Sequence, residues 1–412
     1  MVEIISSRGK HMIYFDNAST SFPKPVEVIQ GVQSLMENSS GNAMRTTSTE
    51  KTDIVFETRK KIAKLFNVKF PTSIVFTSNS TESLNTIIEG YLKPGDHVVS
   101  SAIEHNSVVR PLVRLHKERN IALSWVPVNE FGLINPNDVI EAITEKTTLV
   151  IINHASNVTG TIQDVESIGE QLQAYPDVKF LIDASQTAGH IPIDNQRIKA
   201  DFIAFTGHKA LLGISGVGGY YINPEIKIRP LKVGGTGVLS ELLVQPEGMP
   251  LHYESGTLNT IGIGALFYGI NYIDKFGIEN ISKELIEKTA QVIERLGSFS
   301  EVKIYSQKNA SGIVSFNIDG IIPSRLSTFL SEDANISTRS GLMCAPFIHE
   351  FINTNPFGCV RISMSHFTTQ KEIDTFVDYI AKVIHNLPEI RNINIPKVYS
   401  NPSIYDFNEE GA

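Results

Sequence analysis

Short apolar runs alternate with amphipathic segments from about residue 55 to residue 220, and this alternation constrains the fold more than any other feature. Apolar runs of this length are typical of buried strands, and amphipathic stretches between them are typical of helices. We therefore predict an α/β fold with a large, mainly parallel sheet that carries helices on both faces. The apolar runs are 73–76, 97–100, 148–153, 180–183 and 201–205, and the amphipathic segments are 81–92, 107–117 and 165–174.

The pattern changes after Thr257. Longer helical stretches follow, with strand-like runs between them, and this mixture predicts a smaller α+β domain. Two lobes are also expected because 412 residues exceed the size at which one core usually stops growing. We predict an N-terminal segment (1–25), a large domain (26–260), a small C-terminal domain (261–390) and a surface tail (391–412), with helices at 261–275, 281–296 and 371–387 and strands at 312–318 and 360–364.

The charge balance excludes some classes of partner. The chain has 36 basic and 44 acidic residues without long runs of one sign, so neither nucleic acid nor an anionic membrane is expected as the main partner. Two cysteines are too few for a disulfide framework, and the N-terminus lacks the apolar core of a signal peptide. No apolar run approaches the roughly 20 residues that span a bilayer. We expect a cytoplasmic protein without a metal site.

Polar residues follow the ends of the predicted strands. Ligands of parallel sheets bind beyond the carboxyl ends of the strands, so these side chains are predicted to share one pocket. They are Ser80, Thr81, His105, Asn157, Asp183 and Lys209.

Lys209, in Thr206-Gly207-His208-Lys209, and Asp183 suggest a site for pyridoxal phosphate. That chemistry needs a lysine amine for a Schiff base with the cofactor aldehyde, and a carboxylate that keeps the pyridine nitrogen protonated. A lysine at a strand end is usually a solvated surface residue, so the interpretation depends on the whole set.

Structural roles are also open for these residues. Asn79 and Glu82 have the spacing of a helix cap, although the same helix start would suit a phosphate. His105 could be a core or helix-start histidine, or an imidazole stacked on a cofactor ring. Asp183 could cap the next helix, but a carboxylate at the end of a buried strand needs a cationic partner.

The chain resembles, from Tyr14 to about residue 387, the class V aminotransferase-fold enzymes, which are pyridoxal phosphate-dependent transferases of fold type I. Within them it is similar to cysteine desulfurases and selenocysteine lyases. The resemblance is carried by the ordered motifs STE, EHNS, SNVTGT, DASQTAG, TGHK, ESGTLNT and RSGLMCA.

This resemblance implies roles for the cofactor side of the site. Lys209 would carry the Schiff base and Asp183 would meet the pyridine nitrogen. Gln186 would bind the ring hydroxyl, and His105 would stack on the ring. Phosphate would be held by Ser80, Thr81, Thr206 and His208, and by Thr257 from a second subunit of a homodimer.

The motif at residues 339–345 resembles the group II desulfurase loop, in which a cysteine attacks the substrate sulfur. Cys344 occupies that position, and Leu342 and Met343 replace two histidines often found before it. His349 follows as in a desulfurase-like subfamily. Cys359 has no such motif and is expected to be an inert hydrophobe. Substrate carboxylate would be held by Arg361, assisted by Asn157, with Arg339 in a similar or a bracing role.

The resemblance implies conversion of L-cysteine to L-alanine, with a persulfide on Cys344 that passes to a protein acceptor. The alternatives are a selenocysteine lyase or another C–S lyase acting on L-selenocysteine or L-cysteine, a class V aminotransferase in which Cys344 is incidental, and a catalytically silent partner of a sulfur system.

Overall fold

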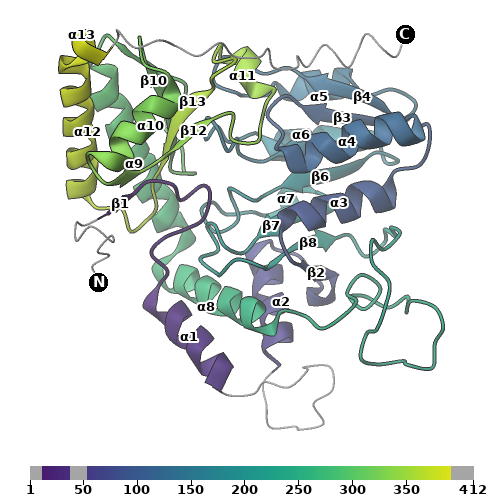
Figure 1. Cartoon of the computed structure of the whole chain (residues 1–412). Coiled ribbons are helices and arrows are strands. Elements are labelled where there is room, and N and C mark those ends of the chain that lie inside the picture. Colours follow the sequence, from purple (N-terminus) through teal and green to yellow (C-terminus); the bar gives the residue numbers. More distant parts are fainter. Residues whose placement is uncertain (1–11, 38–52, 391–412) are drawn as a thin grey trace.

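A seven-stranded sheet forms the centre of the larger lobe (Figure 1), in a computed structural model that describes residues 12–37 and 53–390. All strands but one run parallel, because β8 pairs antiparallel with both of its neighbours. The predicted mainly parallel sheet is therefore confirmed. In spatial order the strands are β2 (Ile74–Thr77), β8 (Gly218–Ile222), β7 (Phe202–Thr206), β6 (Lys179–Asp183), β5 (Thr147–Asn153), β3 (His97–Ser101) and β4 (Ala122–Val126).

Helices cover both faces of this sheet, which explains why its strands are almost continuously apolar. Along β5, Leu149 and Ile151 face one core and Val150 and Ile152 face the other. The first core is closed by α3 (Ser80–Tyr91) and α4 (Asn106–Arg119). The second is closed by α2 (Ile54–Leu65), α5 (Pro136–Glu141), α6 (Val165–Leu172), α7 (Asn195–Ile198) and α8 (Thr260–Phe276).

The smaller lobe contains an antiparallel four-stranded sheet in the order β12 (Arg339–Gly341), β13 (Cys359–Ser363), β10 (Ile313–Ile318) and β9 (Val302–Ile304). Its core is separate from the two cores of the large sheet. The helices and strands predicted after Thr257 are found, each within a few residues of its expected ends, but the helix expected at 261–275 is α8, which packs on the large sheet. Its helices are α9 (Ile278–Gly297), α10 (Pro323–Glu332), α11 (Ile348–Phe351), α12 (Gln370–His385) and α13 (Leu387–Ile390).

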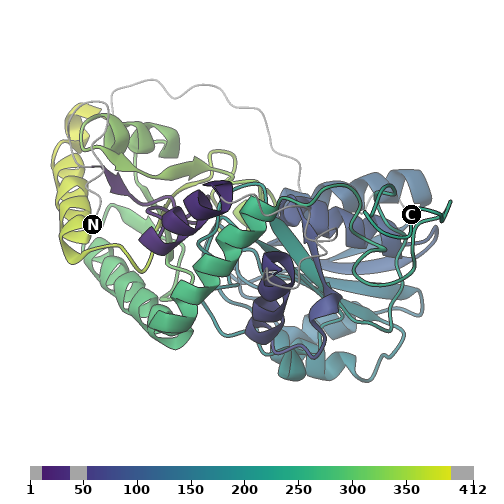
Figure 2. The same cartoon turned by 90° about the horizontal axis from the view of Figure 1, so that it is seen from below.

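The chain passes between the lobes more than once. β1 (Ile13–Tyr14) pairs with β11 (Ile336–Ser337), so the N-terminal strand joins the smaller lobe before α1 (Val26–Glu37) packs against α8. Figure 2 shows the two lobes side by side, with α8 and α9 leading from one to the other. The domain boundaries stay predictions, and the expected tail at 391–412 lies outside the described residues.

Candidate active site

A pocket of about 180 Å³ lies at the carboxyl ends of the parallel strands. It brings together the residues that were expected at the strand ends, together with their neighbours in the same motifs. Asn79, from the helix start that was expected to suit a phosphate, also lines it, as do Ser107, Asn153 and Ser185, which were given no role. The expected residues are Ser80, Thr81, His105, Asn157, Asp183, Gln186, Thr206, His208 and Lys209.

Asp183 ends β6 and is buried. Its Oδ1 accepts hydrogen bonds from the Ser185 N–H at 2.9 Å and from the Ser185 hydroxyl at 2.5 Å. The Ser185 hydroxyl lies 2.6 Å from that of Ser80, at the start of α3. This chain of contacts fixes the carboxylate relative to the helix start across the pocket.

The turn after β7 places Lys209 in the pocket. Burial lowers the pKa of Lys209 to about 8, with Arg361 acting in the same direction and Asp183 opposing it. A substantial fraction of the amine is therefore neutral near physiological pH. A neutral amine can act as a nucleophile or as a base, which an ordinary surface lysine does poorly.

His105 is the N-cap of α4, as one of its structural interpretations anticipated. The ring Nδ1 accepts the Ser107 backbone N–H at 3.1 Å, so the neutral ring carries its proton on Nε2. Burial lowers the pKa of His105, and Lys209 acts in the same direction. His105 can cap α4 and also line the pocket, because the capping hydrogen bond holds its ring at the pocket wall.

Three buried side-chain atoms of pocket residues have no hydrogen-bond partner within the described part of the chain, namely Asn157 Oδ1, Thr206 Oγ1 and His208 Nδ1. Such atoms are uncommon because each costs desolvation free energy, so they mark where a polar ligand fits. Gly218 of β8 lets the start of α3 lie close to the sheet, since a Cβ there would lie 2.7 Å from the Asn79 carbonyl carbon. Asn79 caps α3, so this helix start can serve both as a cap and as an anion site.

Cys344 is exposed, on a turn of the smaller lobe. Its carbonyl accepts the Asn106 backbone N–H at 2.7 Å, which ties the turn to the residue after His105. Cys359 is fully buried in β13, and burial raises the pKa of its thiol to about 12. Of the two thiols, only Cys344 is available for reaction, as the sequence analysis expected.

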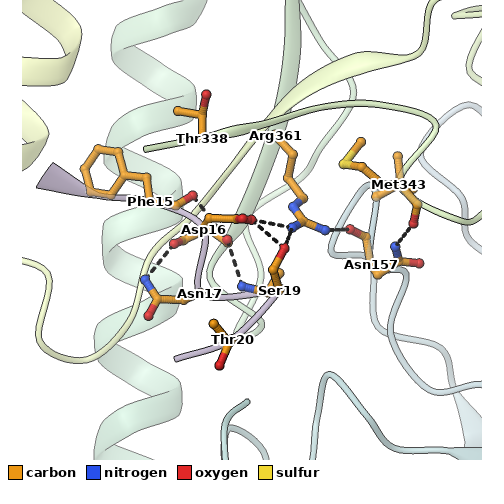
Figure 3. A network of polar contacts seen from close by, with 12 residues as sticks. Phe15, Asp16, Asn17, Ser19, Thr20, Asn157, Thr338, Met343 and Arg361 are labelled. Carbon is orange, nitrogen blue, oxygen red and sulfur yellow. Dashed lines mark hydrogen bonds and ion pairs between the residues drawn. The ribbon is translucent and has the colours of Figure 1, made fainter. Parts of the chain in front are cut away.

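Arg361 is buried in β13 and bonded on two sides (Figure 3). Its Nη2 donates to Asp16 Oδ1 at 2.8 Å and to Ser19 Oγ at 3.0 Å, and Nη1 donates to the Asn157 carbonyl at 2.8 Å. The Nε is buried without a partner in the described ranges. Arg361 therefore forms a largely buried ion pair with Asp16 and keeps one donor, Nε, free within the described residues.

The remaining predicted site residues are Asn157, Arg339 and Thr257. Asn157 donates from Nδ2 to the Met343 carbonyl at 2.7 Å, which leaves its buried Oδ1 unpaired among the described residues. Arg339 is exposed on β12, directly opposite Arg361 in the register. Thr257 is exposed and lines a different cavity, of about 140 Å³.

Sequence reasoning missed Asp16, Ser185 and Glu104. Asp16 belongs to the segment where the resemblance begins, and Ser185 to the motif DASQTAG, so both were visible but given no role. Glu104 precedes His105 and is fully buried. Its Oε1 accepts the Ser101 hydroxyl at 2.6 Å and the Asn153 N–H at 2.8 Å. The only available signal for these residues was their adjacency to residues that were identified.

Glu104 predicts a pH-dependent stability. Burial raises the pKa of Glu104 from 4.5 to about 8, helped by Asp183, so folding favours the neutral acid. Its contribution to the free energy of unfolding is complete below about pH 4.5 and is lost as the pH rises towards 8. Glu104→Gln keeps the shape and stays neutral, so above pH 8 the variant should be more stable by a few kcal/mol. Thermal unfolding midpoints at pH 5 and pH 8.5 test this, and an equal difference at both values would contradict it.

No group of His, Cys, Asp and Glu side chains in the described ranges could hold a metal ion. The same part of the chain includes no helix long and apolar enough to cross a membrane.

A family model for class-V aminotransferases matches residues 13–376. A probable cysteine desulfurase from Borreliella burgdorferi is 34% identical over 401 residues, which cover 92% of this chain and 93% of the relative. Another probable cysteine desulfurase, from Methanothermobacter thermautotrophicus, is 34% identical over 381 residues, which cover 90% of this chain and 94% of that relative.

Solved structures agree with these relatives. The apo structure of a cysteine desulfurase from Thermococcus onnurineus superposes with a TM-score of 0.85 at 30% identity, covering 91% of this chain and 95% of that one. The cysteine desulfurase CsdA from Escherichia coli, in an S-sulfonic acid form, gives a TM-score of 0.82 at 25% identity, with the same coverage of both chains.

Proposed function

Since this chain belongs to the class-V aminotransferase family, we propose that it is a pyridoxal phosphate-dependent cysteine desulfurase that converts L-cysteine to L-alanine and forms a persulfide on Cys344. The expected family, fold and desulfurase activity are confirmed by relatives that match nearly the whole chain. One contact supports the roles of individual residues most directly. The Asn106 N–H donates to the Cys344 carbonyl at 2.7 Å, beside the pocket that Lys209 and Asp183 line.

The pocket residues fit the cofactor. Lys209 has the lowered pKa that a covalent link to an aldehyde requires, and Asp183 offers a carboxylate to a ring nitrogen. Thr206 and His208 have unpaired polar atoms, and with Ser80 and Thr81 they would hold a phosphate. Gln186 would bind the ring hydroxyl; its Nε2 donates to the Ala18 carbonyl at 3.1 Å, so its orientation is already fixed. When bound, pyridoxal phosphate supplies an electron-accepting ring next to the substrate Cα.

The protein's own groups handle binding and protons. The Lys209 amine, freed when the substrate amine takes its place, is positioned to accept the Cα proton. His105, with its proton on Nε2, is the natural relay towards the substrate sulfur. The Cys344 thiolate would attack that sulfur, because the thiolate is the nucleophilic form of cysteine. The S–S bond of the persulfide forms as the substrate Cβ–S bond breaks, and the electron pair of the broken bond stays on the carbon skeleton, which is protonated to give alanine.

Substrate orientation is assigned to Arg361 and Asn157. Arg361 retains a free Nε and Asn157 a free Oδ1 within the described structure, and both atoms are buried. The guanidinium would attract the substrate carboxylate. Asp16 holds the Arg361 guanidinium in a fixed orientation in the absence of substrate. Arg339, on the neighbouring strand, would add positive charge to this region.

The direct experiment is to incubate the purified protein with L-cysteine, pyridoxal phosphate and a reductant, and to measure sulfide and alanine together. Equal amounts of both products support the proposal. Pyruvate in place of alanine would indicate another C–S lyase. Amino-group transfer to a keto acid would indicate an aminotransferase. L-selenocysteine as a second substrate tests whether selenium is preferred to sulfur. We place the reaction in the cytoplasm, with a protein as the sulfur acceptor.

A homodimer is part of the proposal, because Thr257 is exposed and lies outside the pocket of its own chain. The segment before it exposes large apolar side chains, which mark interaction surfaces when they gather in one region. These residues are Leu231, Val233, Leu239, Leu242, Leu243 and Val244.

We predict a light-scattering mass of two chains, and that Leu243→Asp shifts the protein towards the monomer with loss of most activity. Leu243 is fully exposed, so an intrachain packing defect does not explain such a shift. Phe70→Asp, at a residue that is 47% exposed outside this segment, is the control and should leave the mass unchanged. Full activity at the mass of a single chain would exclude shared sites.

A further inference from the structure

The turn that presents Cys344 has a backbone shape that its residues disfavour. The Ala345 N–H donates to the Leu342 carbonyl at 3.0 Å, and the two residues between them have positive φ, 49° at Met343 and 59° at Cys344. Positive φ at both central positions is the pattern of a type I′ turn, in which Gly, Asn and Asp dominate. For other residues this conformation costs roughly 1–2 kcal/mol each. Surrounding contacts must therefore hold the turn.

Three consecutive carbonyls of this turn accept hydrogen bonds from three different parts of the chain. His349 Nε2, in α11, lies 3.2 Å from the Leu342 carbonyl oxygen. The Met343 carbonyl accepts Asn157 Nδ2 at 2.7 Å, from the loop after β5 (Figure 3). The Cys344 carbonyl accepts the Asn106 N–H at 2.7 Å, from the start of α4. Two of these donors belong to the pocket region, and His349 is the support from the turn's own lobe.

The hydrogen bonds of His349 define its protonation. Because a carbonyl oxygen can only accept, Nε2 must carry the proton, and Nδ1 then accepts the Thr354 hydroxyl at 2.6 Å. The ring is fully buried, and the Thr354 N–H returns a bond of 2.9 Å to the His349 carbonyl. Burial also lowers the pKa of His349 to about 4, so the ring stays neutral at physiological pH.

We infer that His349 is a positioning residue for Cys344, which holds the strained turn by its hydrogen bond to the Leu342 carbonyl and transfers no proton in the reaction. This role rests on the proposed function, since Cys344 is the nucleophile of that reaction. The role explains why His349 is buried with both ring nitrogens hydrogen-bonded although the residue does not line the pocket.

Two substitutions separate positioning from proton transfer. His349→Gln retains an amide donor that can reach the Leu342 carbonyl but cannot titrate, whereas His349→Leu has no donor. In His349→Leu we expect amide hydrogen exchange at Ala345 and Asn106 to accelerate about tenfold, the factor that corresponds to loss of one hydrogen bond. The rate of persulfide formation on Cys344 should fall about 100-fold, as for a reacting atom displaced by about 1 Å. His349→Gln should keep most of the protection and most of the rate.

His97→Leu is the matched control. Like His349, His97 is buried with both ring nitrogens hydrogen-bonded, in its case to side-chain hydroxyls, but it begins β3, at the opposite end of the strands from the pocket. It should lower the thermal unfolding midpoint without changing exchange at Ala345 or the persulfide rate. Equal defects in His349→Gln and His349→Leu, or unchanged exchange in His349→Leu, would overturn the inference. The exchange measurement needs no turnover, so it tests the anchor even if the wild-type protein forms no persulfide, which would instead refute the proposed function.

Discussion

Lys209→Ala is expected to abolish the borohydride-reducible bond between the protein and pyridoxal phosphate, and to lower desulfurase activity by at least about 100-fold. The reason is that Lys209 is the amine that lines the pocket and has a pKa lowered to about 8. Mass spectrometry after borohydride reduction measures the bond directly. A cofactor adduct that persists in this variant would show that another amine carries it.

Lys24→Ala is the control for this experiment. Burial lowers the pKa of Lys24 to about 8 as well, and its Nζ donates to the His208 carbonyl at 3.0 Å. Its side chain does not line the pocket. If a lowered pKa alone selected the reactive amine, Lys24 would also be modified. We expect the adduct to remain complete in Lys24→Ala, because position in the pocket decides which lysine reacts.

Cys344→Ser should form no persulfide after exposure to L-cysteine, and alanine release should fall to the background. A hydroxyl is a far weaker nucleophile than a thiolate at neutral pH, while cofactor and substrate binding do not depend on this sulfur. The absorbance change on adding L-cysteine should therefore remain. Undiminished alanine release from this variant would refute the assignment of the nucleophile.

Cys359→Ser provides the matched comparison in the same assay. Cys359 is fully buried and burial raises the pKa of its thiol to about 12, so almost no thiolate forms there at neutral pH. The variant should form the Cys344 persulfide at the wild-type rate, with at most a modest change in stability. A sulfur adduct mapped to Cys359 in the wild-type protein would contradict this account.

The sequence by itself was enough to predict the large sheet and the pocket. Apolar runs such as 148–153 have the continuous hydrophobicity of strands buried on both faces, and β5 occupies that stretch. Because parallel strands end at one edge, polar residues after separate strands were expected to meet, as Asp183 and Lys209 do in the pocket. Glu104 lies in the motif EHNS, but its buried structural role could not be assigned because burial is not readable from one residue.

Only the tertiary structure showed which distant segments meet at the site. Asp16 and Arg361 are 345 positions apart in the sequence and form a largely buried ion pair, so no local pattern predicts their contact. Likewise, the Cys344 turn is held by His349 from its own lobe and by Asn106 and Asn157 from the other. Local sequence determines strands, helices and their ends through short-range sterics and periodicity. Contacts between distant segments depend on how the lobes pack against each other, and that packing determines the position of the Cys344 thiol.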